Sequence, residues 1–164
     1  RALAASTTVL IADEPISALD TSSQAQVANL LVDLVHEFKM GMVFISHDLS
    51  IVRRISDRVA VMYLGKIVEI GTTSQIWENP SHPYTRALVS AIPHADGASF
   101  MPSDLPGDVP NPMNPPSGCR FHPRCQLALP KCTTEEPQFV TLTDNREVSC
   151  FLQREGESPA SITL

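Results

Sequence analysis

Two adjacent carboxylates, Asp13 and Glu14, directly follow the apolar run 9–12 (VLIA), and Pro15 comes next. A short apolar run bounded by a proline predicts a β-strand that is buried on both faces, as in a parallel sheet. Acids at the carboxyl end of such a strand lie where open α/β sheets bind ligands. The pattern therefore favours a ligand-facing acid pair, although an acidic turn after an ordinary strand has the same local sequence.

A histidine follows a second apolar run. Residues 42–45 (MVFI) predict another buried strand, and Ser46, His47 and Asp48 come after it. We expect His47 to lie in the same layer as the acid pair, because the carboxyl ends of parallel strands meet at one edge of a sheet. A lone histidine after a strand is otherwise most often a turn residue.

Four cysteines form a third group, spaced C-x₅-C-x₆-C-x₁₇-C: Cys119, Cys125, Cys132 and Cys150. Two disulfides are possible by number. A structural zinc site usually has closer C-x₂₋₄-C pairs, although His122 between the first two cysteines has suitable spacing. Four thiolates on a proline-rich loop could also bind a [4Fe–4S] cluster. From the residues alone, disulfides, zinc, an iron–sulfur cluster and free thiols all stay open.

The string from Leu10 to Asp20, LIADEPISALD, is far more specific than an acid pair. It resembles the Walker B motif and D-loop of ABC-type ATPases. The resemblance implies that Asp13 holds the Mg²⁺ of Mg-ATP and that Glu14 orients and polarises the attacking water. It further implies that Asp20 acts across the dimer interface. His47 would be the switch histidine, which contacts the γ-phosphate and holds the catalytic carboxylate and water in place.

A second string narrows the family. Residues 81–93, SHPYTRALVSAIP, resemble the signature that opens the C-terminal extension of oligopeptide/dipeptide permease ATPases, and GCRFHPRC at 118–125 is typical of the same family. Members of this family carry a [4Fe–4S] cluster at the corresponding cysteines. The resemblance therefore favours such a cluster here, with Zn²⁺ as the alternative.

Helical spacing and turn residues place the elements around these motifs. Thr21 and Gln24 fit a capping box, and apolar residues then recur at helical spacing up to Phe38. A short helix is expected over 49–55. Two strands follow over 58–64 and 66–70.

The loop between those two strands, Gly65-Lys66, suits a type II′ hairpin. Helices are then expected around Ile76 and Trp77, and from Pro83 onward, where proline suits the first helical turn.

The fold class expected is α/β, namely the C-terminal half of a P-loop (RecA-like) ABC nucleotide-binding domain at residues 1–80. A proline- and cysteine-rich extension should follow at 81–152, because six of the fourteen prolines fall between Pro102 and Pro116. The polar tail at 153–164 is expected to be disordered. Arg1 to Ala5 reads as a helical segment, like the helix that comes just after the signature loop of ABC ATPases.

Two motifs of the family are missing from the sequence: the phosphate loop G-x-x-x-x-G-K-[ST] and the Ser-Gly-Gly signature string. We therefore expect the chain to be the C-terminal portion of a longer subunit. The phosphate loop supplies the amides and the lysine that hold the β- and γ-phosphates. The 164 residues alone are thus expected neither to bind ATP tightly nor to hydrolyse it, and to be poorly stable.

A net charge of −6 without a basic run argues against nucleic acid as a partner. The family resemblance implies an ATPase that powers import of dipeptides or oligopeptides from the cytoplasmic face of the inner membrane, as a peripheral subunit. Its partners would be a second ABC ATPase subunit, two transmembrane permease subunits and, indirectly, an extracytoplasmic peptide-binding protein. A non-peptide cargo such as nickel, or a metal-binding interaction module, are the alternatives.

Overall fold

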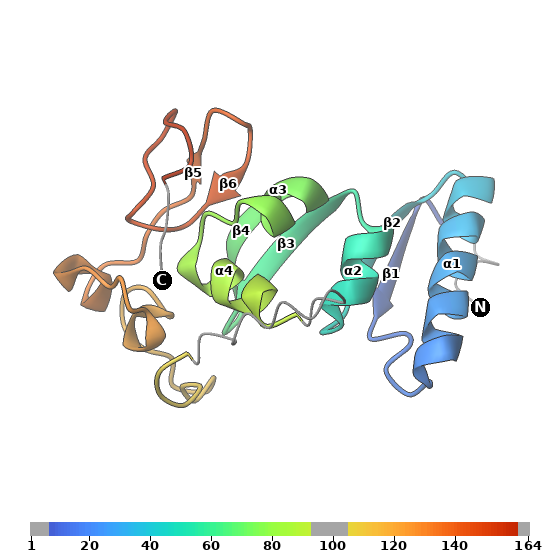
Figure 1. Cartoon of the computed structure of the whole chain (residues 1–164), viewed down its shortest axis with the longest axis horizontal. Coiled ribbons are helices and arrows are strands. Elements are labelled where there is room, and N and C mark those ends of the chain that lie inside the picture. Colours follow the sequence, from blue (N-terminus) through green and yellow to red (C-terminus); the bar gives the residue numbers. More distant parts are fainter. Residues whose placement is uncertain (1–6, 93–104, 161–164) are drawn as a thin grey trace. The chain divides into compact units, whose positions relative to one another are not determined.

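The computed structural model describes residues 7–92 and 105–160 (Figure 1). The helical segment expected at Arg1–Ala5 lies outside the described residues. The chain divides into two compact units, residues 1–56 and 57–164. The division lies well before residue 80, where the composition changes, so residues 57–80 fold with the proline- and cysteine-rich part.

The first unit alternates strands and helices: β1 (Val9–Asp13), α1 (Thr21–Glu37), β2 (Gly41–Ile45) and α2 (Leu49–Ile55). The two strands pair in parallel, with Asp13 opposite Ile45. The mixed α/β order of this unit agrees with the expectation from sequence. Its buried core comprises three residues and the apolar side chains packed against them: Ile16, Ala28, Ile51, Val27, Phe44 and Ile55.

One face of the β1–β2 sheet is exposed, so the expectation that both faces are buried is wrong for the described residues. Its apolar side chains keep about half or more of their surface in solvent: Val9, Ile11, Val43 and Ile45. They share a face because successive side chains of a strand point to opposite sides. Exposed apolar surface of this kind is the physical basis for expecting low stability of the chain by itself.

The N-cap of α1 is Asp20, not Thr21 as the capping-box pattern predicted. The Asp20 carboxylate accepts hydrogen bonds from the Ser22 hydroxyl at 2.6 Å, the Ser23 amide at 3.0 Å and the Ser23 hydroxyl at 2.8 Å. Aspartate and threonine are both good N-caps. These bonds, that from the Ser22 hydroxyl above all, hold the pKa of Asp20 well below its usual range.

The second unit contains an antiparallel sheet in the order β3-β4-β6-β5. Its strands are β3 (Arg58–Tyr63), β4 (Lys66–Thr72), β5 (Val140–Thr141) and β6 (Glu147–Val148).

The turn between β3 and β4 differs from the expected Gly65-Lys66 loop. Lys66 pairs with Tyr63, so the two loop residues are Leu64 and Gly65. Both have positive φ, 45° and 75°. Positive φ at both positions is typical of a type I′ turn rather than type II′, and it matches the twist of the strands.

Two helices follow the hairpin, as predicted: α3 (Thr73–Glu78) and α4 (Pro83–Ser90). Helix α3 begins with a capping box of Thr72 and Gln75. Helix α4 has proline in its first turn and His82 as N-cap, whose Nδ1 accepts the Tyr84 amide at 3.1 Å. Two short 3₁₀ helices, His122–Arg124 and Pro130–Thr133, come later in the chain.

A buried polar network joins the sheet to the start of α4. Glu69, fully buried on β4, accepts the amides of Ser81 at 2.7 Å and His82 at 2.9 Å. Arg146, 2% exposed, donates to Ser81 Oγ at 2.9 Å and lies 3.5 Å from Glu69 Oε1. Asp144 Oδ2 accepts from Arg146 at 2.7 Å. The network ties β4, the α3–α4 loop and the β5–β6 turn together.

The start of the polar tail is ordered, contrary to the expectation for 153–164. Gln153 is buried and donates from Nε2 to the Ser81 carbonyl at 2.9 Å. Its Oε1 accepts the Ala160 amide, and the Gly156 amide donates to the Thr141 carbonyl at 2.8 Å. These bonds order residues 153–160. The expectation for 161–164 lies outside the described residues.

Candidate functional site

Glu14 and His47 meet at the carboxyl ends of β1 and β2. The pairing of the strands continues one residue past β1, where the Glu14 amide donates to the Ile45 carbonyl at 2.9 Å. Glu14 Oε1 accepts the His47 amide at 3.1 Å and contacts His47 Nδ1 at 2.8 Å. Parallel pairing of the strands therefore brings together two residues 33 positions apart, as the sequence predicted.

The second carboxylate oxygen of Glu14, Oε2, is buried and has no hydrogen-bond partner among the described residues. The Glu14 backbone has a φ of +45°, which is uncommon for a residue other than glycine. Strained backbone and unpaired polar atoms both occur preferentially at functional sites. Glu14 therefore has one oxygen held by His47 and one that is buried without a partner in the described part of the chain.

The His47 ring is exposed, and its contact with Glu14 sets its charge. The hydrogen bond to the Glu14 carboxylate, helped by the negative charge, raises the pKa of His47 above its usual 6.5. Because the carboxylate only accepts, Nδ1 carries a proton in this contact. In the protonated ring, Nε2 carries a second proton and is a donor as well.

Neighbouring acids differ in what they do. Asp13 is exposed at the end of β1, and within the described residues its carboxylate makes no hydrogen bond or ion pair. Asp48 caps α2 by accepting the amides of Ser50 and Ile51 at 2.9 and 3.3 Å. Asp20 caps α1. The Asp13 carboxylate is thus unpaired among the residues that the structure describes and able to coordinate a metal ion, whereas Asp20 has a structural role in addition to any role at an interface.

All four cysteines of the second unit line one small apolar cavity and are free thiols. The cavity has a volume of about 20 Å³, enough for about one water molecule. Cys119, His122 and Cys125 follow one another at intervals of three along consecutive i→i+3 backbone hydrogen bonds. In a 3₁₀ segment this spacing places side chains on one face. The His122 ring contacts the Cys119 carbonyl through Nδ1 at 2.9 Å.

Burial favours the protonated form of three of these thiols. It raises the pKa of Cys119 and Cys125, and the pKa of Cys150 to about 12. The charges of the other three cysteines contribute to the raised pKa of Cys150, so the four thiols are electrostatic neighbours. As they stand, the described residues contain no group of three or more His, Cys, Asp or Glu side chains placed to hold a metal ion.

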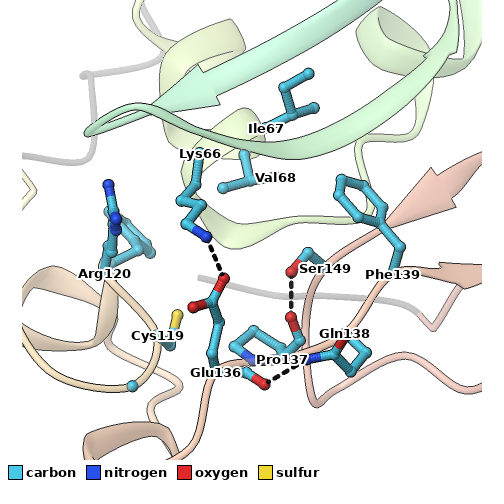
Figure 2. A pocket seen from close by; sticks show the side chains of 12 residues that line it. Lys66, Ile67, Val68, Cys119, Arg120, Glu136, Pro137, Gln138, Phe139 and Ser149 are labelled. Atoms are coloured by element: carbon cyan, nitrogen blue, oxygen red, sulfur yellow. Dashed lines mark hydrogen bonds and ion pairs between the residues drawn. The ribbon is translucent and has the colours of Figure 1, made fainter.

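A larger cavity of about 220 Å³ adjoins the cysteines, and Cys119 and Phe121 line both. Figure 2 shows Cys119 at its edge, close to Glu136. The Glu136 carboxylate forms an ion pair with Lys66, with Nζ and Oε1 2.9 Å apart. Arg120 donates from Nη1 to the Leu64 carbonyl on the hairpin. One cysteine, Cys119, therefore lines this larger cavity as well as the small apolar one.

Comparison with known proteins gives the context of both sites. Residues 68–132 match the family "Oligopeptide/dipeptide transporter, C-terminal region". The chain is 51% identical over 154 residues to a probable peptide ABC transporter ATP-binding protein of Sinorhizobium fredii, covering 93% of this chain and 44% of that protein. The chain belongs to the ATP-binding proteins of the oligopeptide/dipeptide ABC transporters.

Two further relatives in this transporter family have names that state a cargo. A dipeptide transport ATP-binding protein of Haemophilus influenzae is 51% identical over 144 residues, which are 87% of this chain and 44% of the relative. An oligopeptide transport ATP-binding protein of Bacillus subtilis is 48% identical over 155 residues, 93% of this chain and 47% of the relative. The chain thus spans about half the length of these family members. Among its described residues, no helix is long and apolar enough to cross a bilayer.

Sequence reasoning missed three residues that shape these sites in this family member. Glu69 lies among apolar residues of its strand, and a carboxylate in such a run indicates burial with a hydrogen-bond or charge partner. Arg146 gave little local signal, because its partners Ser81 and Glu69 lie more than 60 residues away and only Asp144 is close in sequence. Gly118 precedes the first cysteine, and its positive φ of 65° could have been suspected from glycine at a tight turn.

Proposed function

We propose that this chain contributes the catalytic carboxylate and the switch histidine to the ATP site of a peptide-importing ABC transporter. One observation supports this most strongly: Glu14 and His47 meet at the ends of two parallel strands, 2.8 Å apart. Relatives whose names state dipeptide or oligopeptide transport support the cargo class over nickel.

Glu14 would act on the attacking water. Its Oε1 is held by the backbone and ring of His47, while the buried Oε2 has no partner among the described residues and would accept a hydrogen bond from the attacking water once the assembled site admits it. A carboxylate with one oxygen fixed and one free can orient and polarise a nucleophilic water at a defined position. His47 is thus a positioning residue for Glu14 as well as a phosphate contact.

His47 would contact the γ-phosphate in its protonated form. Its raised pKa favours the imidazolium, in which Nδ1–H donates to Glu14 and Nε2–H is free to donate to an anionic oxygen. Asp13, free at the strand end, would hold Mg²⁺, which neutralises charge on the phosphates when bound. Asp20 would communicate across the dimer in addition to capping α1.

The complete transporter would contain a second ATP-binding subunit, two membrane permease subunits and, indirectly, an extracytoplasmic peptide-binding protein, with this subunit peripheral on the cytoplasmic face. Because the phosphate loop is not in these 164 residues, they should bind ATP weakly alone. A fluorescent-nucleotide titration that gave micromolar affinity for the bare chain would contradict this.

Replacement of Glu14 by Gln tests the catalytic proposal. In the assembled transporter, we expect Glu14→Gln to lower the rate of ATP hydrolysis by roughly 100-fold or more, because general-base groups contribute about 10²–10⁴. Glu37→Gln, at an exposed acid at the end of α1, is the control and should keep the wild-type rate. Equal rates for Glu14→Gln and wild type would favour the alternative of an interaction module.

For the cysteine pocket we propose a metal centre, a [4Fe–4S] cluster at Cys119, Cys125, Cys132 and Cys150, with Zn²⁺ as the alternative. Four sulfur donors suit thiophilic metals, and one apolar cavity gathers them. The cavity's small volume favours a single ion, whereas the family resemblance favours the cluster, for which the walls would have to move apart. Iron and zinc analysis with a visible absorption spectrum of anaerobically purified protein distinguishes the two.

A further inference from the structure

Gly118, next to Cys119, lies in close contact with the backbone of the segment that carries Cys132. A Cβ at this position would lie 2.5 Å from the Cys132 carbonyl oxygen, 2.9 Å from the Thr133 carbonyl carbon and 3.0 Å from the Glu135 amide nitrogen. All three are backbone atoms, which cannot rotate aside as a flexible side chain can. Only a residue without a Cβ fits this space, and its φ of +65° also favours glycine.

The same contact is fixed by hydrogen bonds. The Cys119 amide donates to the Cys132 carbonyl at 2.9 Å, and the Ser117 hydroxyl donates to the Thr133 carbonyl at 2.7 Å. Cys119 and Cys132 both line the apolar cavity. The approach at Gly118 therefore determines how far apart the backbones that carry these two thiols lie.

We propose that Gly118 is a positioning residue of the four-cysteine pocket, setting the separation at which Cys119 faces Cys132. A methyl group there would lie about 1 Å closer to the Cys132 carbonyl oxygen than ordinary van der Waals contact allows. The two segments would therefore have to separate by a similar amount. Metal–ligand distances tolerate only about ±0.2 Å. The consequence for metal binding rests on the function proposed above, whereas the packing of the thiols does not.

Two other glycines of the same unit provide matched controls. Gly107 and Gly156 have φ values of +70° and +69°, close to that of Gly118, but an added Cβ at either would meet nothing within 4 Å. Alanine at these positions carries the same backbone cost without the steric contact. A difference between Gly118→Ala and Gly107→Ala therefore reports the contact with the Cys132 segment.

The first test needs no metal: thiol labelling of the reduced, metal-free chain under native conditions, with each cysteine quantified by mass spectrometry. We expect Gly118→Ala to label Cys119 and Cys132 roughly 5- to 100-fold faster than wild type, as the cost of overpacking implies. Gly107→Ala and Gly156→Ala should label like wild type. Gly118→Asn should label as fast as Gly118→Ala, because asparagine tolerates positive φ but still has a Cβ.

Equal labelling of Gly118→Ala and Gly107→Ala, or a wild-type rate for Gly118→Asn, would overturn the proposal. Global unfolding would expose all four thiols alike. The proposal therefore also requires that Gly118→Ala increase the labelling rates of Cys119 and Cys132, relative to wild type, more than that of Cys150. If Gly118→Ala does not fold, Ser117→Ala replaces it, because it removes one hydrogen bond and adds no atom. Ser117→Ala should then speed labelling of the same two thiols by roughly 2- to 10-fold, and no change would overturn the proposal.

The second test measures iron and zinc per chain after anaerobic purification. We expect wild type and Gly107→Ala to retain equal metal, and Gly118→Ala at least fivefold less. Equal metal in Gly118→Ala and wild type would overturn the role of Gly118 in metal binding. A wild type without metal would instead overturn the proposed cofactor, while the labelling experiment would still decide whether Gly118 positions the thiols.

Discussion

Replacement of Arg146 by Met should destabilise the second unit strongly. Arg146 is buried, and its guanidinium donates to Ser81 Oγ at 2.9 Å and to Asp144 at 2.7 and 2.8 Å. It also lies 3.5 Å from Glu69, which has no exposed surface. Methionine has a similar shape but no charge, so the substitution leaves the Glu69 carboxylate buried without its cation.

The magnitude follows from the cost of an unpaired buried charge. Removing one partner of a buried ion pair costs about 3–5 kcal/mol of unfolding free energy. The backbone amides of Ser81 and His82 continue to donate to Glu69, which argues for the lower part of that range.

Urea unfolding followed by tryptophan fluorescence measures this directly, because Trp77 is the single tryptophan of the chain and lies on α3 in the same unit. Arg154→Ala is the control. Its 3.7 Å pair with Glu157 is exposed, and such pairs contribute about 0–1 kcal/mol. If Arg146→Met lowered the unfolding free energy no more than Arg154→Ala, the buried network would not stabilise the unit.

Two further predictions concern His82 and Asp20. Burial lowers the pKa of His82 from 6.5 to about 3, so its stabilising contribution is complete above pH 6.5 and is lost as the pH falls from 6.5 towards 3. Between pH 7 and pH 5 this loss of unfolding free energy is about 2 kcal/mol. It should disappear in His82→Asn, which keeps an acceptor for the Tyr84 amide. If urea unfolding of His82→Asn had the same pH dependence as wild type, the assignment to His82 would be contradicted. For Asp20, circular dichroism should show helix loss at lower temperature in Asp20→Ala than in Asp20→Ser, since serine is also a good N-cap. Equal melting of the two variants would show that the cap does not stabilise α1.

Local patterns were sufficient to predict the order of strands and helices through α4. The apolar runs ending at Ala12 and Ile45 are short and bounded by turn residues, which distinguishes strands from helices. Parallel pairing then brings Glu14 and His47 together without further information. The family resemblance supplied their chemical roles, which stay predictions.

Features that depend on distant residues could not be predicted. Strands β5 and β6 have two residues each, too few for any periodicity. Strand β6 depends on pairing with β4, and β5 on pairing with β6. The order of residues 153–160 depends on Gln153, whose partner Ser81 lies 72 positions away. The choice of Asp20 over Thr21 as N-cap was ambiguous because both residue types favour that position.

The contact between Glu14 and His47 can be tested on the chain itself by NMR titration of the His47 imidazole. The resonances are assigned with a His47→Gln variant, because the chain has five histidines. We predict a pKa above 6.5 in wild type and in Glu37→Gln, and a lower one in Glu14→Gln, which loses the carboxylate that raises it. The same titration curve in wild type and Glu14→Gln would contradict the pairing on which the proposed ATP site depends.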